Sequence, residues 1–230
     1  MTASEALTRQ TWKNFVALHW PVPGDALRPL LPPSLTPALL DGHCRVTLAA
    51  FEIAAIEVAT PLPLPKLPPF AQIEVRTYAQ DASGAVGVWY LALATSSAAA
   101  ATAARMAFGL DYRSAAIAIA CDDAEEPLVT VDARADRPDP VACSLALRGA
   151  ATSSIPQPES LDAVLLMPTH AWSRSGESLV RIDVDRGPTR VSRASVEALD
   201  ETWLWSVGIR RPSTAAIAHF IRESEIAIHR

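Results

Sequence analysis

The sequence predicts an α+β fold that is mainly antiparallel β, a curled sheet or barrel with a few peripheral helices. Three observations predict it. Short stretches in which apolar and polar residues alternate recur along the 230-residue chain, and this period of two is typical of half-buried strands. Turn sequences rich in Asp, Gly and Pro separate these stretches. Helical periodicity is confined to two or three short runs, too few to cover both faces of a parallel sheet.

The first third of the chain contains two strands and one helix in this prediction. An apolar-rich run over residues 12–20 indicates a strand, and residues 24–31 form a short helix stopped by Pro32 and Pro33. Alternation predicts a long strand over 45–58. Residues 61–70 then hold five prolines. We interpret them as an extended crossover because they run straight into a strand; the alternative is a ligand for a proline-binding domain.

The rest of the chain continues the pattern of strands. A hairpin is predicted over 73–80 and 86–93, around the turn sequence Asp81-Ala-Ser-Gly84. Ser96 or Ser97 can cap a helix over 98–108, which Gly109 ends. Ser160 can cap a second helix over 161–167. The remaining predicted strands are 114–121, 128–135, 141–149, 179–185, 189–196 and 225–229.

Composition and charge restrict the class of protein. Half of the residues are apolar and a fifth are charged, which is enough to build a core and excludes disorder. No repeat or Gly/Ser linker divides the chain, so we expect one domain over residues 1–230. The net charge of −5 argues against nucleic-acid binding, which needs clustered cations.

Location and cofactors are predicted from what the sequence lacks. Residues 1–10 carry Glu5 and Arg9 and no apolar signal core, and no apolar run is long enough to span a membrane. We therefore expect a cytoplasmic protein without a membrane partner. No phosphate-binding loop, GxSxG or HExxH motif is present, and the histidines are scattered. The three cysteines have no CxxC spacing, so we predict neither a metal nor a cofactor.

Two polar groups interrupt this apolar pattern. In a strand over 70–78, Glu74, Arg76 and Tyr78 share one face, while the other face is apolar apart from Thr77. Inside a barrel these charges must pair with each other or with a ligand. They are either part of a site or a structural salt bridge that closes the barrel. The second group, Tyr112 and Arg113, lies where the predicted helix meets the next strand, a common place for functional residues.

Several motifs, most of them in the first half, point to one family. They are Trp12, His19-Trp20-Pro21-Val22, Leu27–Pro32, Phe70-x-x-x-Glu74-Val75-Arg76-Thr77-Tyr78, Gly87–Tyr90, Ala104-Arg105 and Tyr112-x-x-Ala115. With them the chain resembles the bacterial DUF2071 (YqjF-like) family of the acetoacetate decarboxylase-like superfamily. The resemblance covers about residues 12–121 and is weaker beyond, where an ERY-like and an H-x-P-W element are missing.

The resemblance implies a sheet rolled into a cone or barrel with a central pocket. Acetoacetate decarboxylases in this superfamily use a lysine Schiff base. The best match places Tyr112 at the position of that lysine and Arg113 at its cationic neighbour. Arginine stays protonated and cannot replace a nucleophilic lysine. Because Lys13 and Lys66 are the only lysines and neither matches, Schiff-base decarboxylation is disfavoured. Glu74 does match the decarboxylases' pocket glutamate.

We therefore predict a central pocket for a small organic acid or carbonyl compound. Lyase- or hydratase-like acid/base chemistry would use Glu74 as general base and Tyr112 as acid or hydrogen-bond donor. The predicted substrate-binding residues are Arg76, which would orient an acid by bidentate bonding, with Arg113, His19 and Tyr78.

Each of these features also has an interpretation that involves no catalysis. The protein can be a non-catalytic small-ligand binding or sensor module with the same pocket. Tyr112 and His19 can be packing residues of the core. Trp203 and Trp205 would share one face of a strand, either in the core or at the interface of a homo-oligomer.

Overall fold

The sheet that the alternation predicts is present in the computed structural model, which describes residues 6–59, 67–136, 139–176 and 178–229. Most of the proline-rich segment, including Lys66, lies outside the described residues. Seven strands close into a barrel in the order β1-β3-β4-β5-β10-β11-β13, with β13 pairing back onto β1. Their bounds are β1 Thr8–Val22, β3 Cys44–Val58, β4 Phe70–Gln80, β5 Val86–Thr95, β10 His170–Ser175, β11 Ser178–Arg186 and β13 Ile217–His229.

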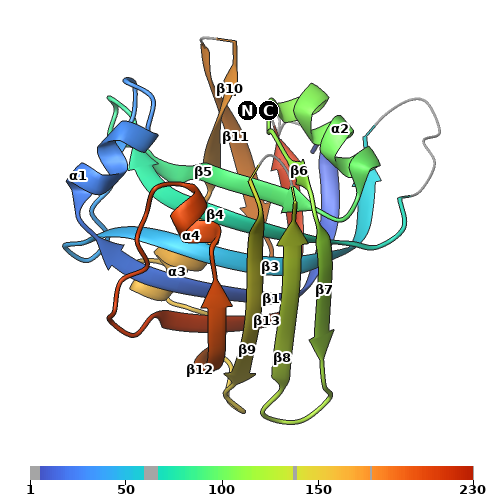
Figure 1. Cartoon of the computed structure of the whole chain (residues 1–230). Helices are drawn as coiled ribbons and strands as arrows, with labels where there is room; N and C mark the ends of the chain where they lie inside the picture. The colour runs from blue at the N-terminus through green and yellow to red at the C-terminus, as the bar shows by residue number, and fades with distance from the viewer. Residues whose placement is uncertain (1–5, 60–66, 137–138, 177, 230) are drawn as a thin grey trace.

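The same sheet continues beyond the barrel at β13, and this outer part is called the second sheet below. The order continues from β13 through β12, β9 and β8 to β7, all antiparallel. Figure 1 shows β7, β8 and β9 crossing in front of the barrel strands β1, β3 and β4. Two short strands, β2 and β6, pair with β4 and β5. The bounds are β12 Ser192–Glu201, β9 Val141–Gly149, β8 Leu128–Ala135, β7 Ala116–Cys121, β2 Thr36–Pro37 and β6 Arg113–Ser114.

The helices are short and peripheral, as the sequence predicts. The Ser97 side chain caps α2 by accepting from the Ala100 amide, and Gly109 ends the helix with a positive φ of 67°. Ser160 caps α3 in the same way through the Ala163 amide. No helix in the described part of the chain has the length and apolar character needed to cross a membrane. The bounds are α1 Gly24–Leu27, a 3-10 turn Arg28–Leu30, α2 Ala98–Phe108, α3 Leu161–Leu166 and α4 Trp203–Ser206.

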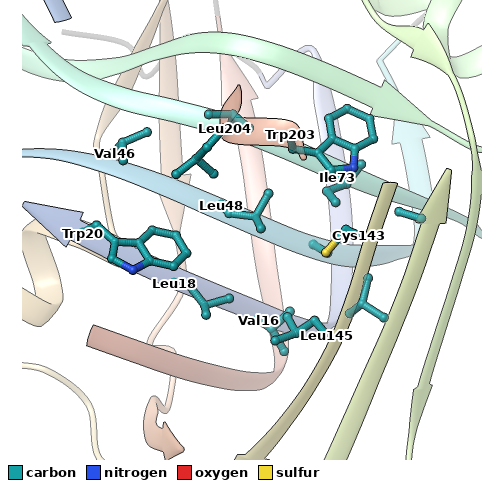
Figure 2. Close-up of a cluster of buried hydrophobic side chains, with 14 of the residues drawn as sticks. Val16, Leu18, Trp20, Val46, Leu48, Ile73, Cys143, Leu145, Trp203 and Leu204 are labelled. Carbon is teal, nitrogen blue, oxygen red and sulfur yellow. The ribbon is translucent and has the colours of Figure 1, made fainter. Parts of the chain in front are cut away.

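The two largest hydrophobic cores of the described residues lie on opposite faces of the barrel wall. The outer core fills the space between the barrel and the second sheet, and Figure 2 shows part of it, including Trp20, Leu48, Ile73, Leu145 and Trp203. The inner core lies inside the barrel. Strand β4 serves both cores, because alternate side chains point to opposite faces. A bulge between Val75 and Arg76 shifts its register against β5.

The structure corrects the predicted strand at Trp203–Trp205, which is the helix α4. Trp203 is fully buried in the outer core, whereas Trp205 is 72% exposed, so the two rings do not share a face. The predicted helix over 24–31 divides into a helical and a 3-10 turn. Strand β10 has no counterpart in the prediction, and β13 is far longer than the predicted 225–229.

Candidate functional site

The barrel interior encloses a cavity of about 180 Å³. Most of its wall is apolar, contributed by the inner faces of the barrel strands and by one side of α2. Leu165 and Leu166 of α3 are buried in the same inner core. The polar side chains of the wall include Gln10, Gln72, Glu74, Arg76, Tyr90, Tyr112, His170 and Arg186. A few polar groups in an apolar concavity are typical of a small-molecule site.

Glu74 and Arg76 form a buried ion pair on β4 at the edge of this cavity. The Arg76 Nη1 donates to Glu74 Oε1 at 2.8 Å, and the Arg76 and Glu74 side chains are 3% and 2% exposed. Arg76 Nη2 also donates to the carbonyl of Leu165 at 3.1 Å. Burial raises the pKa of Glu74, while Arg76 opposes that rise. The sequence left open whether the pair is a structural salt bridge or part of a site. In the structure it is a buried salt bridge and also forms part of the cavity wall.

Tyr112 lines the same cavity from the segment between α2 and β6. Its hydroxyl accepts a hydrogen bond from Gln72 Nε2 at 3.0 Å, so its own proton remains available to another acceptor. Burial raises the pKa of Tyr112 well above its ordinary value, and nearby Tyr90 and Glu74 add to that rise. The phenol is therefore neutral and able to donate at physiological pH.

Arg186, at the end of β11, is a cavity residue that sequence reasoning missed. Its guanidinium lies 4.9 Å from the centre of the Trp12 ring, and Nη1 donates to Ser224 Oγ at 3.2 Å. The alternation of 179–185 holds a signal that could have found it. Arg186 continues the face of Val180, Ile182 and Val184, whereas the exposed Arg181 falls on the opposite face.

His170 is another polar residue of the cavity wall that the predicted site did not include, and it begins the unpredicted strand β10. The side chain is buried, and Nδ1 lies 3.1 Å from Thr169 Oγ1. Its ring meets Trp172 edge-on. Burial lowers the pKa of His170, so it is neutral at physiological pH.

The other predicted site residues do not belong to the described lining of this cavity. His19 Nδ1 is 2.7 Å from Thr47 Oγ1, which is 3.2 Å from the Tyr78 hydroxyl. Tyr78 then donates to the Leu165 carbonyl at 2.7 Å, the same oxygen that Arg76 contacts. His19 and Tyr78 thus form a buried network behind Arg76. Arg113 lies over Trp203 of the outer core, 5.7 Å from the ring centre.

The described cavity wall contains neither a lysine nor a group of metal ligands. Lys13 is half-exposed and pairs with Glu223 at 3.2 Å on β13; it does not line the cavity. Lys66 lies outside the described residues. Among the residues that the structure describes, no three metal-ligating side chains are grouped to hold an ion.

The family of the chain follows from its similarity to known proteins. The family model DUF2071, described as an uncharacterised conserved protein, matches residues 9–225. The chain belongs to the DUF2071 family. This DUF2071 protein is also 21% identical over 220 residues to the uncharacterised protein YqjF of Bacillus subtilis (strain 168), covering 96% of this chain and 89% of YqjF.

Solved structures similar to this DUF2071 protein share the acetoacetate decarboxylase-like fold. The enduracididine biosynthesis enzyme MppR, complexed with the condensation product of pyruvate and imidazole 4-carboxaldehyde, matches with a TM-score of 0.67 and 13% identity, over 97% of this chain and 87% of MppR. An acetoacetate decarboxylase-like enzyme from Sphingomonas wittichii RW1 gives 0.63 and 13%, over 97% and 91%. The acetoacetate decarboxylase of Legionella pneumophila gives 0.60 and 11%, over 100% and 92%. These matches confirm the predicted fold.

Proposed function

We propose that this DUF2071 protein binds a small organic acid or carbonyl compound in the barrel cavity and moves a proton at the carbon next to its carbonyl group. The observation that carries the proposal is the convergence of Glu74 and Tyr112 on one apolar-walled cavity. A carboxylate and a neutral phenol facing a shared space form an acid/base pair.

Glu74 is the base in this proposal. Its carboxylate takes a proton from the α-carbon, and the electrons of the C–H bond form the enolate of the bound carbonyl compound. A base works best when its pKa approaches the working pH, and burial moves the pKa of Glu74 upward in that direction. Arg76 holds one carboxylate oxygen at 2.8 Å, which leaves the other for the proton.

Tyr112 stabilises the charge that this step creates. The hydrogen bond from Gln72 occupies an acceptor position on the phenol oxygen, so the O–H is free to donate to the enolate oxygen. A donor already held in place where negative charge develops lowers the barrier. Returning the proton, or expelling a leaving group from the β-carbon, completes an exchange or a lyase reaction.

The structural neighbours support a small carbonyl acid as ligand, since MppR has been solved with pyruvate. At 11–13% identity these structures show only that the fold is shared. The evidence for the function is therefore the cavity of this chain. The proposal requires no covalent intermediate, since Glu74 and Tyr112 act by proton transfer and hydrogen bonding alone.

Solvent exchange tests the proton step whatever the final product of the reaction is. We expect the wild type to exchange the α-protons of 2-oxobutanoate with D₂O, followed by ¹H NMR. Glu74→Gln should slow exchange by about a hundredfold or more, in line with the loss of a general base, and Tyr112→Phe should slow it less. Glu223→Gln, at the surface pair with Lys13, is the control.

Calorimetry measures whether each protein binds the acid. If the wild type and both site variants bind it but none of them exchanges its α-protons, the protein is a binding module and the catalytic part of the proposal fails.

Borohydride trapping tests whether the chemistry avoids a Schiff base. We expect no mass increase when the protein is reduced with sodium borohydride in the presence of pyruvate, because a Schiff base needs a neutral lysine at the ligand. A trapped adduct in the wild type that is absent from Lys66→Ala would contradict the non-covalent mechanism. Lys13→Ala controls for surface labelling.

A further inference from the structure

We infer that Arg186, and not Arg76, anchors the ligand, and that the ligand is therefore a monocarboxylate whose acid group lies over β11 and β13. This inference rests on the proposed function, because it names the class of molecule that the same cavity takes. It assigns a binding role to a residue outside the predicted site.

Both terminal nitrogens of Arg76 already donate hydrogen bonds to acceptors within the protein. Its Nη1 is bonded to Glu74 and its Nη2 to the Leu165 carbonyl, and the side chain is 3% exposed. The Arg76 Nε has no hydrogen-bond partner among the described residues, but both terminal nitrogens hold protein acceptors and Glu74 balances the charge. A ligand carboxylate at Arg76 would therefore compete with Glu74 for the same cation, and a buried charge that loses its partner is costly.

Arg186 differs from Arg76 in having fewer protein acceptors and no paired carboxylate. Its one hydrogen bond within the described chain is from Nη1 to Ser224 Oγ, and no carboxylate of a described residue forms an ion pair with it. Its Nε is buried without a hydrogen-bond partner among the described residues. A guanidinium has five N–H donors in a planar fork that matches a carboxylate. Most of these donors have no acceptor here, although the residue lines the cavity.

The surroundings of Arg186 hold it in place without using its donors. The guanidinium carbon lies over the ring of Trp12. The Trp12 indole N–H donates to Gln10 at 2.7 Å, and its ring stacks on Phe51 with centres 4.1 Å apart. Ser224 in turn lies 2.9 Å from Thr189 Oγ1. The cation–π contact with Trp12 uses the positive charge and not the N–H donors of Arg186, which stay available to an anion.

The charges of the cavity wall specify one negative group. Among the described lining residues the charged side chains are Glu74, Arg76 and Arg186. Glu74 balances Arg76 in the ion pair, which leaves one positive charge for the ligand to balance. Burial, with Arg76 nearby, lowers the pKa of Arg186 to about 9, so it is still cationic at neutral pH. A single carboxylate on an apolar chain fits one free cation within apolar walls.

Matched acids and amides test the inference with calorimetry. The probes are propanoate, butanoate, pentanoate and hexanoate, each compared with its amide, which has nearly the same shape and no charge. We expect the wild type to bind the best acid at least about tenfold more tightly than its amide, since a charge-assisted bidentate pair exceeds a neutral hydrogen bond by this much. Arg186→Gln should abolish the preference for the acid and retain binding of the amide.

Two further variants separate the anchor from general electrostatics. Arg186→Lys keeps the charge and loses the fork, so an intermediate preference is expected. Arg181→Gln removes a half-exposed arginine that pairs with Asp183 on the same strand, and it should change nothing. In the wild type itself, the Arg186 Nε–H resonance, assigned by its loss in the lysine variant, should shift on adding the acid and not on adding the amide.

The outcomes distinguish the two proposals. The anchor assignment is wrong if the wild type binds the amides as tightly as the acids. It is also wrong if Arg186→Gln still prefers the acids. In both cases the cavity is still a binding site for small molecules. If neither acids nor amides bind the wild type, the proposed function itself fails. Should Arg186→Gln not fold, the lysine variant and the wild-type resonance decide, and an unshifted resonance at saturating acid would overturn the inference.

Discussion

Among the single residues, three buried histidines occupy two different places in the barrel. His170 faces the cavity. His19 and His219 lie behind it, with ring centres 5.2 Å apart and both side chains fully buried. Burial, then the charge of His219 and of the arginines Arg76, Arg45 and Arg193, lowers the pKa of His19 well below its ordinary value. For His219 burial outweighs Asp162, 3.2 Å away, and lowers the pKa.

This pair should make the fold sensitive to acid. The unfolded histidines take up protons near pH 6.5 while the folded ones stay neutral, so the unfolded state binds more protons and stability falls as the pH drops below 6.5. Each histidine contributes a slope of up to about 1.4 kcal/mol per pH unit. Urea unfolding between pH 7 and pH 5 should show a shallower slope in the double variant His19→Gln, His219→Gln than in the wild type.

His43→Gln, at an exposed position elsewhere in the chain, is the matched control for the loss of a histidine side chain. An equal slope in the double variant and the wild type would mean that other groups, such as His170, carry the acid sensitivity.

At the scale of elements, α2 is the part of the cavity wall that depends most on local sequence. Its alanines let the helix approach the barrel closely, and several of them line the cavity. Ser97 begins the helix and Gly109 ends it. The backbone at Gly109 has φ of +67°, and an added Cβ would overlap the carbonyl oxygen of Arg174 in β10. This glycine therefore sets how closely α2 and β10 approach each other.

Gly109→Ala should consequently destabilise the protein through two effects. The left-handed conformation costs about 1 kcal/mol for a residue with a Cβ, and the overlap with Arg174 adds about 1–3 kcal/mol as an overpacked contact. Gly208→Ala is the control, because Gly208 has φ of +80° with open space around it. Urea unfolding should show a clearly larger loss of unfolding free energy for Gly109→Ala than for Gly208→Ala. Equal losses would show that β10 moves away from the added methyl group at little cost.

At the scale of the whole molecule, the second sheet and α4 stabilise the barrel from outside. Their apolar side chains and those of β1, β3 and β4 form the outer core, which includes the fully buried Trp203 (Figure 2). The cavity inside the barrel removes contacts from the inner core, and a stable wall is needed to keep it open. The outer core provides that support without occupying the site.

The two tryptophans of α4 allow this division to be measured. Trp203→Ala should lower the free energy of unfolding by about 3–5 kcal/mol, as large core truncations do. Trp205→Ala should change it by about 0.5 kcal/mol or less, because the ring is 72% exposed. Chemical denaturation of both variants checks the difference, and comparable losses would show that Trp205 is buried in solution, for instance against a second copy of the chain.

The local elements were predictable because their signals lie within a few residues. The caps at Ser97 and Ser160, the end at Gly109 and the hairpin at Asp81–Gly84 depend on short-range hydrogen bonds and backbone preferences. Strand β10 was missed because His170–Ser175 is short and does not alternate. Helix α4 was misassigned because two tryptophans two residues apart also fit the period of a strand.

The antiparallel sheet, the family resemblance and the polar row of β4 could be predicted from the order of the amino acids, because they follow from the period of two and from local motifs. The packing of distant segments sets which charges meet. It joined Arg76 to Glu74 and Leu165, set His19 and Tyr78 behind that pair, and brought Arg186 into the cavity with Glu74. Closure of the barrel places β11 and β4 on opposite sides of one cavity, and no local pattern encodes this approach of distant parts of the chain.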